Sequence, residues 1–268
     1  MAAPAGPILV VGVGAMGGAL IAGWRRLGVF AASELILRDP APGAQAIAAQ
    51  KEGASLNGAD AELAGAGALV LAVKPQLWRS TAQAIAPHLG AEAIVVSIVA
   101  GVSAAAIAEA FGGRPVARVM PTLAAAMGHG TASLYSADPA ARERARALFA
   151  PLGEVVELAD ETLMHAATAV SGSAPAYFYA LVEALEAAGA DAGLSPPVAA
   201  RLARSTLTGA AALLAASREP PATLRAAVTS PGGVTEAALD VLTGPGGLGP
   251  LMVRAARAGV ARSRELGG

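Results

Sequence analysis

The stretch that decides the fold is Ile8-Leu9-Val10-Val11-Gly12-Val13-Gly14-Ala15-Met16-Gly17. An apolar run leads into a glycine-rich turn, and an amphipathic stretch follows over residues 19–28. This order predicts the strand, G-x-G-x-x-G loop and helix of a dinucleotide-binding unit. In such a unit Gly12 makes the tight turn, Gly14 admits the pyrophosphate, and Gly17 lets helix and strand pack closely. The predicted cofactor-binding loop comprises Gly12, Gly14, Ala15, Met16 and Gly17.

The end of the next predicted strand bears on the choice of cofactor. A second apolar run follows about 20 residues after the loop, and it closes with Arg38 and then Asp39. An acidic residue here binds the ribose hydroxyls of NAD, whereas an Arg accommodates the 2′-phosphate of NADP. Because Arg38 holds the earlier, strand-end position, we expect NADPH to bind at Arg38. NADH is the alternative cofactor, and Asp39 would then bind its ribose hydroxyls.

The composition favours a small-molecule partner. The 268 residues carry a formal net charge of −1, and the arginines are scattered, so we expect neither nucleic acid nor a membrane surface as partner. There is no cysteine and the three histidines are isolated, which predicts no metal site. Residues 93–108 are too short and polar to span a bilayer, and no signal-peptide pattern precedes the first strand. We therefore expect a cytoplasmic protein.

Two patterns divide the chain. Short β-branched runs alternate with helical patterns at first, which predicts an α/β domain, whereas alanine- and leucine-rich helices follow. We expect strands at 8–13, 35–38, 68–73, 93–98, 115–120, 131–135 and 154–158. We expect later helices at 161–169, 174–192, 196–217, 221–228, 234–242 and 249–265. The predicted architecture is an α/β Rossmann-like N-terminal domain, residues 1–160, followed by an all-α C-terminal domain, residues 161–268.

One of the predicted helices is apolar around most of its circumference. It begins near Pro175 and continues from Ala176 to Ala188. Such a helix must be buried, and a few short helices cannot easily enclose it. We expect a second subunit to cover it; a central position within one subunit is the alternative.

The turn Ser230-Pro231-Gly232-Gly233-Val234-Thr235 separates two predicted helices and opens the second. The first turn of a helix has N–H groups without intrahelical partners and carries partial positive charge, so a carboxylate fits there. Two glycines leave the backbone accessible, while Ser230 and Thr235 add hydroxyl groups. The turn predicts a carboxylate site. A plain connector between helices is the structural alternative.

The lysines exclude one related class of enzyme. The chain has only Lys51 and Lys74, both before the helical half. The β-hydroxyacid dehydrogenases share the G-x-G-x-M-G opening and a helical second domain, but they use a lysine on that domain. The chain also lacks a G-x-S-x-G elbow and a Walker A motif, so hydrolase and phosphotransferase activities have no support.

With these motifs the chain resembles the pyrroline-5-carboxylate reductases over nearly its whole length. The resemblance rests on residues 12–17, 72–75, 97–102, 120–121, 171–177 and 230–235, with Ala238-Leu239 behind them. It implies NAD(P)H-dependent reduction of the C=N bond of 1-pyrroline-5-carboxylate to L-proline, the last step of proline biosynthesis. The alternatives are a reductase of another imine on the same scaffold and an NADPH-binding protein without catalysis.

The resemblance also implies where the ligands bind. The nicotinamide would lie near Ala72, Val73, Lys74, Pro75, Val99, Ala100, Gly101, Met120 and Pro121. The substrate carboxylate would bind Ser230, Gly233, Val234 and Thr235. In this family the helical domains of two subunits interlock, which implies a homodimer, with a decameric ring of dimers as the larger assembly. Two departures are Thr122-Leu123-Ala124, where the family usually has Asn-Thr-Pro, and Arg225-Ala226 in place of Lys-Asp.

Thr235 is the predicted catalytic residue. Hydride reduction of a cyclic imine needs a proton on nitrogen, and solvent can supply that proton before the substrate binds. The Thr235 hydroxyl then has only to hydrogen-bond the nitrogen. The alternative for Thr235 is a helix cap. His129 and His165 are candidate proton donors, although a lone histidine in an apolar segment is more often structural.

Overall fold

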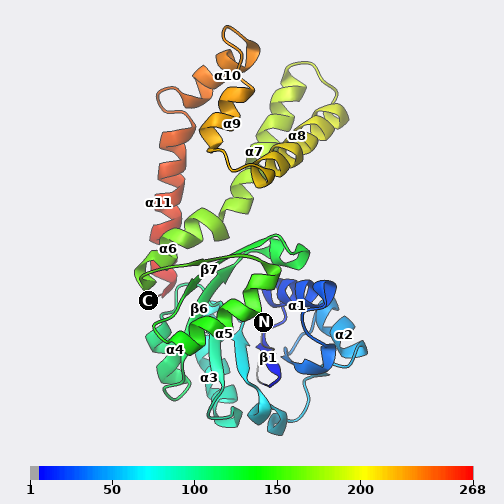
Figure 1. Cartoon of the computed structure of the whole chain (residues 1–268), viewed down its shortest axis with the longest axis vertical. Helices are drawn as coiled ribbons and strands as arrows, with labels where there is room; N and C mark the ends of the chain where they lie inside the picture. Colours follow the sequence, from blue (N-terminus) through cyan, green and yellow to red (C-terminus); the bar gives the residue numbers. More distant parts are fainter. Residues whose placement is uncertain (1–5, 268) are drawn as a thin grey trace. The chain divides into compact units, whose positions relative to one another are not determined.

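The computed structural model describes residues 6–267 (Figure 1). The N-terminal segment on which the signal-peptide expectation rests therefore lies mostly outside the described residues. The chain forms two compact units. The first runs up to Gly172 and includes the residues from Gly259 onward, and the second is Ser173–Ala258.

The first unit is built on one eight-stranded sheet with the order β3-β2-β1-β4-β5-β6-β7-β8. Neighbouring strands are parallel except β6 and β7, which are antiparallel. The strand order reverses between β1 and β4, as in Rossmann folds, so the predicted fold class is confirmed. The strands are β1 Ile8–Val11, β2 Leu35–Arg38, β3 Ser55–Leu56, β4 Ala68–Leu71, β5 Ile94–Ser97, β6 Val116–Pro121, β7 Gly130–Tyr135 and β8 Gly153–Glu157.

Helices cover both faces of this sheet. Ile8 and Val10 of β1 pack into a core with α1 (Ala15–Leu27), α2 (Ala44–Lys51) and α5 (Pro139–Phe149). Leu9 and Val11 point to the opposite face and pack with α3 (Trp78–Ile85) and α4 (Ala104–Ala110). Because both faces are buried there, the central strands β1 and β4 are continuously apolar rather than alternating.

The sequence analysis missed strand β3. This strand has two half-buried residues that pair with Ile36 and Leu37 of β2. A two-residue strand is too short to show any periodicity in the sequence, so it becomes visible only through its partner strand.

The helices of the second half lie close to the predicted ranges, with one exception. They are α6 Met164–Ala167, α7 Ala174–Asp191, α8 Pro196–Ala216, α9 Pro221–Ala227, α10 Val234–Thr243 and α11 Leu248–Gly267. The single helix predicted at 161–169 is wrong: Glu161–Leu163 is a 3₁₀ turn, α6 has four residues, and Thr168–Gly172 is a π-helical turn. The Thr168 and Ser171 hydroxyls donate to the carbonyls of Met164 and Ala167 at 2.7 and 2.8 Å. Such bonds compete with regular helical pairing.

Within the second unit, α7 and α8 pack closely. A Cβ atom added at Gly189 of α7 would lie 3.1 Å from the Cβ of Ala199 on α8, so the small residue permits this approach. No helix among residues 6–267 is long and apolar enough to cross a membrane.

Candidate functional site

The glycine loop has the geometry that a dinucleotide phosphate needs. Gly12 has φ +92°, and a Cβ there would lie 2.6 Å from the Ala72 carbonyl oxygen. A Cβ at Gly17 would lie 2.1 Å from the Gly12 carbonyl oxygen, so α1 could not pack onto the strand. Gly14 is the N-cap of α1, is exposed, and has nothing within 4 Å of an added Cβ. The open space at a helix N-terminus fits a pyrophosphate.

A cavity of about 370 Å³ adjoins this loop. It is lined by loop residues 13–15, by residues of α1, and by Ala41 and residues 43–45 at the start of α2. The cavity therefore lies where β2 leads into α2, on the side of the loop on which the ribose contact was predicted.

At the end of β2, Arg38 and Asp39 point to different partners. The Asp39 carboxylate accepts the Val13 N–H at 2.5 Å and the Ala41 N–H at 2.8 Å. Arg38 instead donates to the Ala59 carbonyl at 2.9 Å, and its guanidinium is 3.7 Å from the Asp60 carboxylate. The acidic residue therefore contacts the glycine loop, and the basic one contacts the turn after β3.

Asn57 is a residue that the sequence analysis missed. It adopts the left-handed conformation with φ 52°. Its side chain accepts the Asp39 N–H at 3.0 Å and donates to the Asp39 carbonyl at 2.8 Å. Asn57 therefore fixes the backbone of Asp39 at both ends. The dipeptide Asn57-Gly58 was a readable turn signal, but nothing local showed which residue the turn would hold.

The segments predicted to bind the nicotinamide lie at one edge of the sheet. Residues 72–75 follow β4, residues 99–101 follow β5, and Met120-Pro121 end β6. These three strands are parallel neighbours, so their carboxyl ends meet at the same edge. Ser97 accepts the Val99 N–H at 3.3 Å, and Gly101 turns the chain with φ +81°. This edge is where Rossmann sheets bind their ligands.

The residue that departs from the family pattern, Thr122, is buried and bonded. Its hydroxyl accepts the Thr131 N–H at 3.0 Å, which ties the end of β6 to β7. Next to it, the π-helical turn packs against Met120, because a Cβ at Gly172 would lie 3.4 Å from the Met120 side chain. Single-turn π-helices frequently accompany functional sites.

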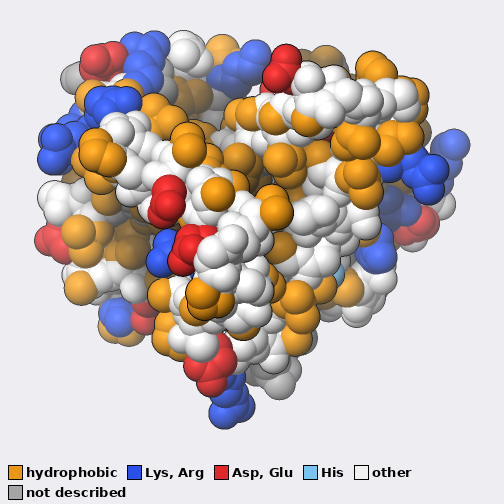
Figure 2. All heavy atoms as spheres, turned by 90° about the horizontal axis from the view of Figure 1, so that it is seen from above, with side chains coloured by type: hydrophobic (Ala, Val, Ile, Leu, Met, Phe, Trp, Pro, Cys, Tyr) orange, Lys and Arg blue, Asp and Glu red, His pale blue; other side chains and the backbone are white. Residues whose placement is uncertain are grey.

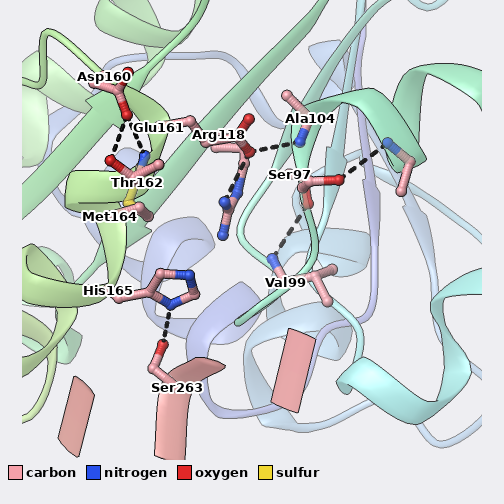
Figure 3. A network of polar contacts seen from close by, with 12 residues as sticks. Ser97, Val99, Ala104, Arg118, Asp160, Glu161, Thr162, Met164, His165 and Ser263 are labelled. Atoms are coloured by element: carbon pink, nitrogen blue, oxygen red, sulfur yellow. Dashed lines mark hydrogen bonds and ion pairs between the residues drawn. The ribbon is translucent and has the colours of Figure 1, made fainter. Parts of the chain in front are cut away.

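A buried ion pair supports the loop after β5 (Figure 3). Arg118 of β6, only 4% exposed, pairs with Glu161 at 2.8 Å. The same Glu161 oxygen accepts the Ala104 N–H at 2.7 Å at the start of α4. Because α4 directly follows the predicted nicotinamide loop, this carboxylate fixes the position of that loop relative to β6.

His165 has a structural environment rather than a catalytic one. Its Nδ1 shares a hydrogen bond of 2.9 Å with the buried Ser263 hydroxyl near the end of α11 (Figure 3). Burial and the nearby charges of Arg118 and Arg264 lower the pKa of His165, although Glu161 acts in the opposite direction. A neutral imidazole held by a serine joins α6 to α11. The other candidate donor, His129, is exposed.

The turn predicted to bind a carboxylate lies in the second unit and opens α10. Gly232 has φ +67° and Gly233 is the N-cap. The Gly232 N–H donates to the Glu236 carboxylate at 2.7 Å, which holds the turn against the helix. Ser230, Val234 and Thr235 are exposed. Since Gly233 is the N-cap, Thr235 does not have the capping role that was its structural alternative.

The predicted cofactor residues therefore all lie in the first unit, and the predicted substrate residues all lie in the second. Among residues 6–267 there is no group of three or more His, Asp or Glu that could hold a metal ion.

The fold and the glycine loop define the class: this is an oxidoreductase with a Rossmann-type domain for a nicotinamide nucleotide. Residues 7–101 match the model of the family "NADP oxidoreductase coenzyme F420-dependent", and residues 161–266 match the model "Pyrroline-5-carboxylate reductase dimerisation". A pyrroline-5-carboxylate reductase of Pseudomonas aeruginosa is 40% identical over 97% of this chain and 96% of its own. The chain belongs to the pyrroline-5-carboxylate reductase family.

Solved structures agree with this assignment. The structure of a pyrroline-5-carboxylate reductase from Coxiella burnetii has a TM-score of 0.89 at 27% identity, covering 98% of this chain and 99% of its own. A pyrroline carboxylate reductase of Plasmodium falciparum, solved with NADP bound, has a TM-score of 0.85 at 24% identity, with complete coverage of both chains. The second likeness bears on the fold alone.

Proposed function

We infer that this chain reduces the C=N bond of 1-pyrroline-5-carboxylate to L-proline, with a reduced nicotinamide nucleotide as hydride donor. Family membership over nearly the full length supports the reaction. The exposed Pro-Gly-Gly turn at the start of α10, a ten-residue helix, supports a substrate that bears a carboxylate. Its first-turn amides suit a substrate carboxylate. Nothing in the comparisons favours another imine reductase or a non-catalytic protein.

The roles of the residues follow from the charge of the substrate. Ser230 and the amides of Gly233, Val234 and Thr235 bind the carboxylate, and the Thr235 hydroxyl hydrogen-bonds the ring nitrogen. The nicotinamide, when bound, supplies the hydride. Hydride adds to the imine carbon while the nitrogen keeps the proton that solvent gave it, so the chain needs no strong acid. These residues chiefly position the imine against the nicotinamide, and such positioning can raise the reaction rate by several orders of magnitude.

The cofactor lies on the first unit in this proposal, held by the glycine loop and by residues 72–75, 99–101 and 120–121. The Arg38 side chain, which was expected to bind the 2′-phosphate of NADPH, donates to the Ala59 carbonyl instead. The assembly is a homodimer through the helical unit, and a ring of dimers is its larger form. We propose that residues of both subunits form each active site. We also propose that the enzyme works in the cytoplasm.

The experiment follows the absorbance of the reduced nucleotide at 340 nm with three imines. Pyrroline-5-carboxylate should be reduced fastest, the six-membered carboxylated ring more slowly, and a pyrroline without a carboxylate slowest. The last comparison isolates the carboxylate site, because the C=N bond is unchanged. Absent turnover of pyrroline-5-carboxylate, or equal kcat/KM with the uncarboxylated ring, would contradict the proposal.

A further inference from the structure

We propose that Asp39, rather than Arg38, selects the cofactor, and that the site prefers NADH to NADPH. The inference rests on the proposed function, since it names the nucleotide that the same site takes. Arg38 and Asp39 are neighbours in sequence, but Arg at this place favours NADPH and Asp favours NADH. Their side-chain partners decide between them.

Asp39 has the position of a ribose ligand. It directly follows β2, whose neighbour β1 leads into the glycine loop, and the Gly12 N–H donates to the Arg38 carbonyl at 2.8 Å. The Asp39 carboxylate is thereby brought to Val13 of that loop. Each of its oxygens accepts one backbone N–H, from Val13 and from Ala41. A carboxylate has about four acceptor sites, so capacity remains for two ribose hydroxyls.

The carboxylate is also held in place. Asn57 bonds both the N–H and the carbonyl of Asp39. Together with the two amides on the carboxylate, these contacts fix backbone and side chain before any ligand arrives. A ligand with a 2′-phosphate could displace the Asp39 carboxylate only by breaking the bonds to Val13 and Ala41.

Arg38 is directed elsewhere. Its side chain is 12% exposed, one terminal nitrogen donates to the Ala59 carbonyl, and Asp60 lies 3.7 Å away. The other terminal nitrogen is buried and has no partner among the described residues. A phosphate arriving from solvent does not meet the buried nitrogen unless the side chain moves, and the other nitrogen already donates to Ala59. The positive charge therefore stabilises the turn after β3.

The charges then favour the nucleotide without the phosphate. A 2′-phosphate beside a fixed carboxylate is a like-charge pair, and such a pair remains unfavourable near a protein surface. The ribose hydroxyls of NADH, in contrast, donate hydrogen bonds to the carboxylate. We expect NADH to bind at least about tenfold more tightly than NADPH, since hydrogen bonds to charged groups are among the stronger ones.

The test measures binding without any imine substrate. Dissociation constants of NADH and NADPH are determined by nicotinamide fluorescence for the full chain and for Asp39→Ser, Asp39→Asn and Arg38→Met. Asp39→Asn keeps the shape of the side chain and one acceptor oxygen. It therefore replaces Asp39→Ser in the test if the serine variant does not fold. Either Asp39 variant should shift the ratio of the two constants toward NADPH by about tenfold or more. Arg38→Met should leave that ratio unchanged, whatever it does to stability.

Three results would overturn the inference. They are equal or tighter binding of NADPH by the unaltered chain, a ratio that Asp39→Asn does not move, and a ratio that Arg38→Met moves toward NADH. The binding data remain readable if pyrroline-5-carboxylate is not turned over. Failure of the proposed reaction and failure of the cofactor assignment are therefore separate outcomes.

Discussion

At the residue scale, the glycines of the first loop have different reasons to be glycine. Gly12 needs a positive φ, which a side chain would strain. Gly17 has no such φ, but a Cβ there would collide with the backbone of Gly12. Gly14 has neither constraint from the protein itself, because nothing lies near its missing side chain. The structure itself therefore does not require a glycine at position 14, and the open space there is what the proposed pyrophosphate site needs.

Thr235 and Ser230 should respond differently to substitution. Thr235→Ala removes the bond to the ring nitrogen and should lower kcat about tenfold to a hundredfold. Ser230→Ala removes a carboxylate anchor used in ground and transition states alike, so KM should rise more than kcat falls. Steady-state kinetics of both variants check this.

The melting temperature is the control for both variants. Thr235 is exposed and Gly233 is the N-cap, so neither substitution should cost more than about 0.5 kcal/mol of stability. A Thr235→Ala protein with unchanged kcat would remove the catalytic role.

At the element scale, side chains far apart in sequence join the short helices to the sheet. Glu161 connects β6 to α4, and His165 connects α6 to the end of α11 (Figure 3). The final turns of α11 are thereby part of the first unit. Because α11 begins in one unit and ends in the other, the chain crosses between the units a second time, after the crossing that follows the π-helical turn.

His165 should make stability depend on pH. Its pKa is lowered from the usual 6.5, chiefly by burial, with Arg118 and Arg264 adding to the effect. The unfolded chain thus binds the proton more readily, so the stabilising contribution is complete above pH 6.5 and is lost as pH falls through the lowered pKa. His165→Gln should flatten the dependence of the unfolding free energy on pH below about 6.5.

Chemical denaturation over this pH range measures the effect. His129→Gln, which replaces an exposed histidine in the same way, is the matched control. An identical fall in stability with acid in unaltered and His165→Gln proteins would exclude this linkage.

At the scale of the whole molecule, the helical unit has apolar surface that its own helices do not cover. Helix α7 has no buried residue, and its stripe Phe178, Leu181 and Leu185 is about half exposed. Figure 2 shows hydrophobic side chains over much of the face seen there. The other helices of this unit therefore do not enclose α7, as the alternative of a central helix would require. The match to a dimerisation family over residues 161–266 accounts for this surface.

Leu181→Arg should weaken the dimer. A charge placed in a buried apolar contact is costly, and we expect the dissociation constant to rise about tenfold or more. Sedimentation equilibrium over a range of concentrations measures it. Ile47→Arg, at a similarly exposed apolar position on α2, is the control and should not change the assembly. A fully active monomer of the unaltered chain at low concentration would contradict both the dimer and the shared active site.

Features that depend on neighbouring residues could be predicted from the sequence alone. The glycine loop, the order of α/β and helical parts, five of the six later helices and the turn before α10 are all readable from local spacing. These patterns are local because capping, turns and amphipathic faces involve residues within a few positions of one another.

The directions of the long side chains, in contrast, became known from the folded structure. Arg38 bonds Ala59, Asp39 bonds Val13, and Asn57 holds Asp39, across 18 to 26 positions of sequence. The π-helical turn and strand β3 likewise depend on the elements that pack against them. A side chain with several rotatable bonds takes its direction from the partners that folding brings to it. In the sequence, the adjacent residues Arg38 and Asp39 therefore indicate two different cofactors. Only the contacts of the two side chains distinguish between these cofactors.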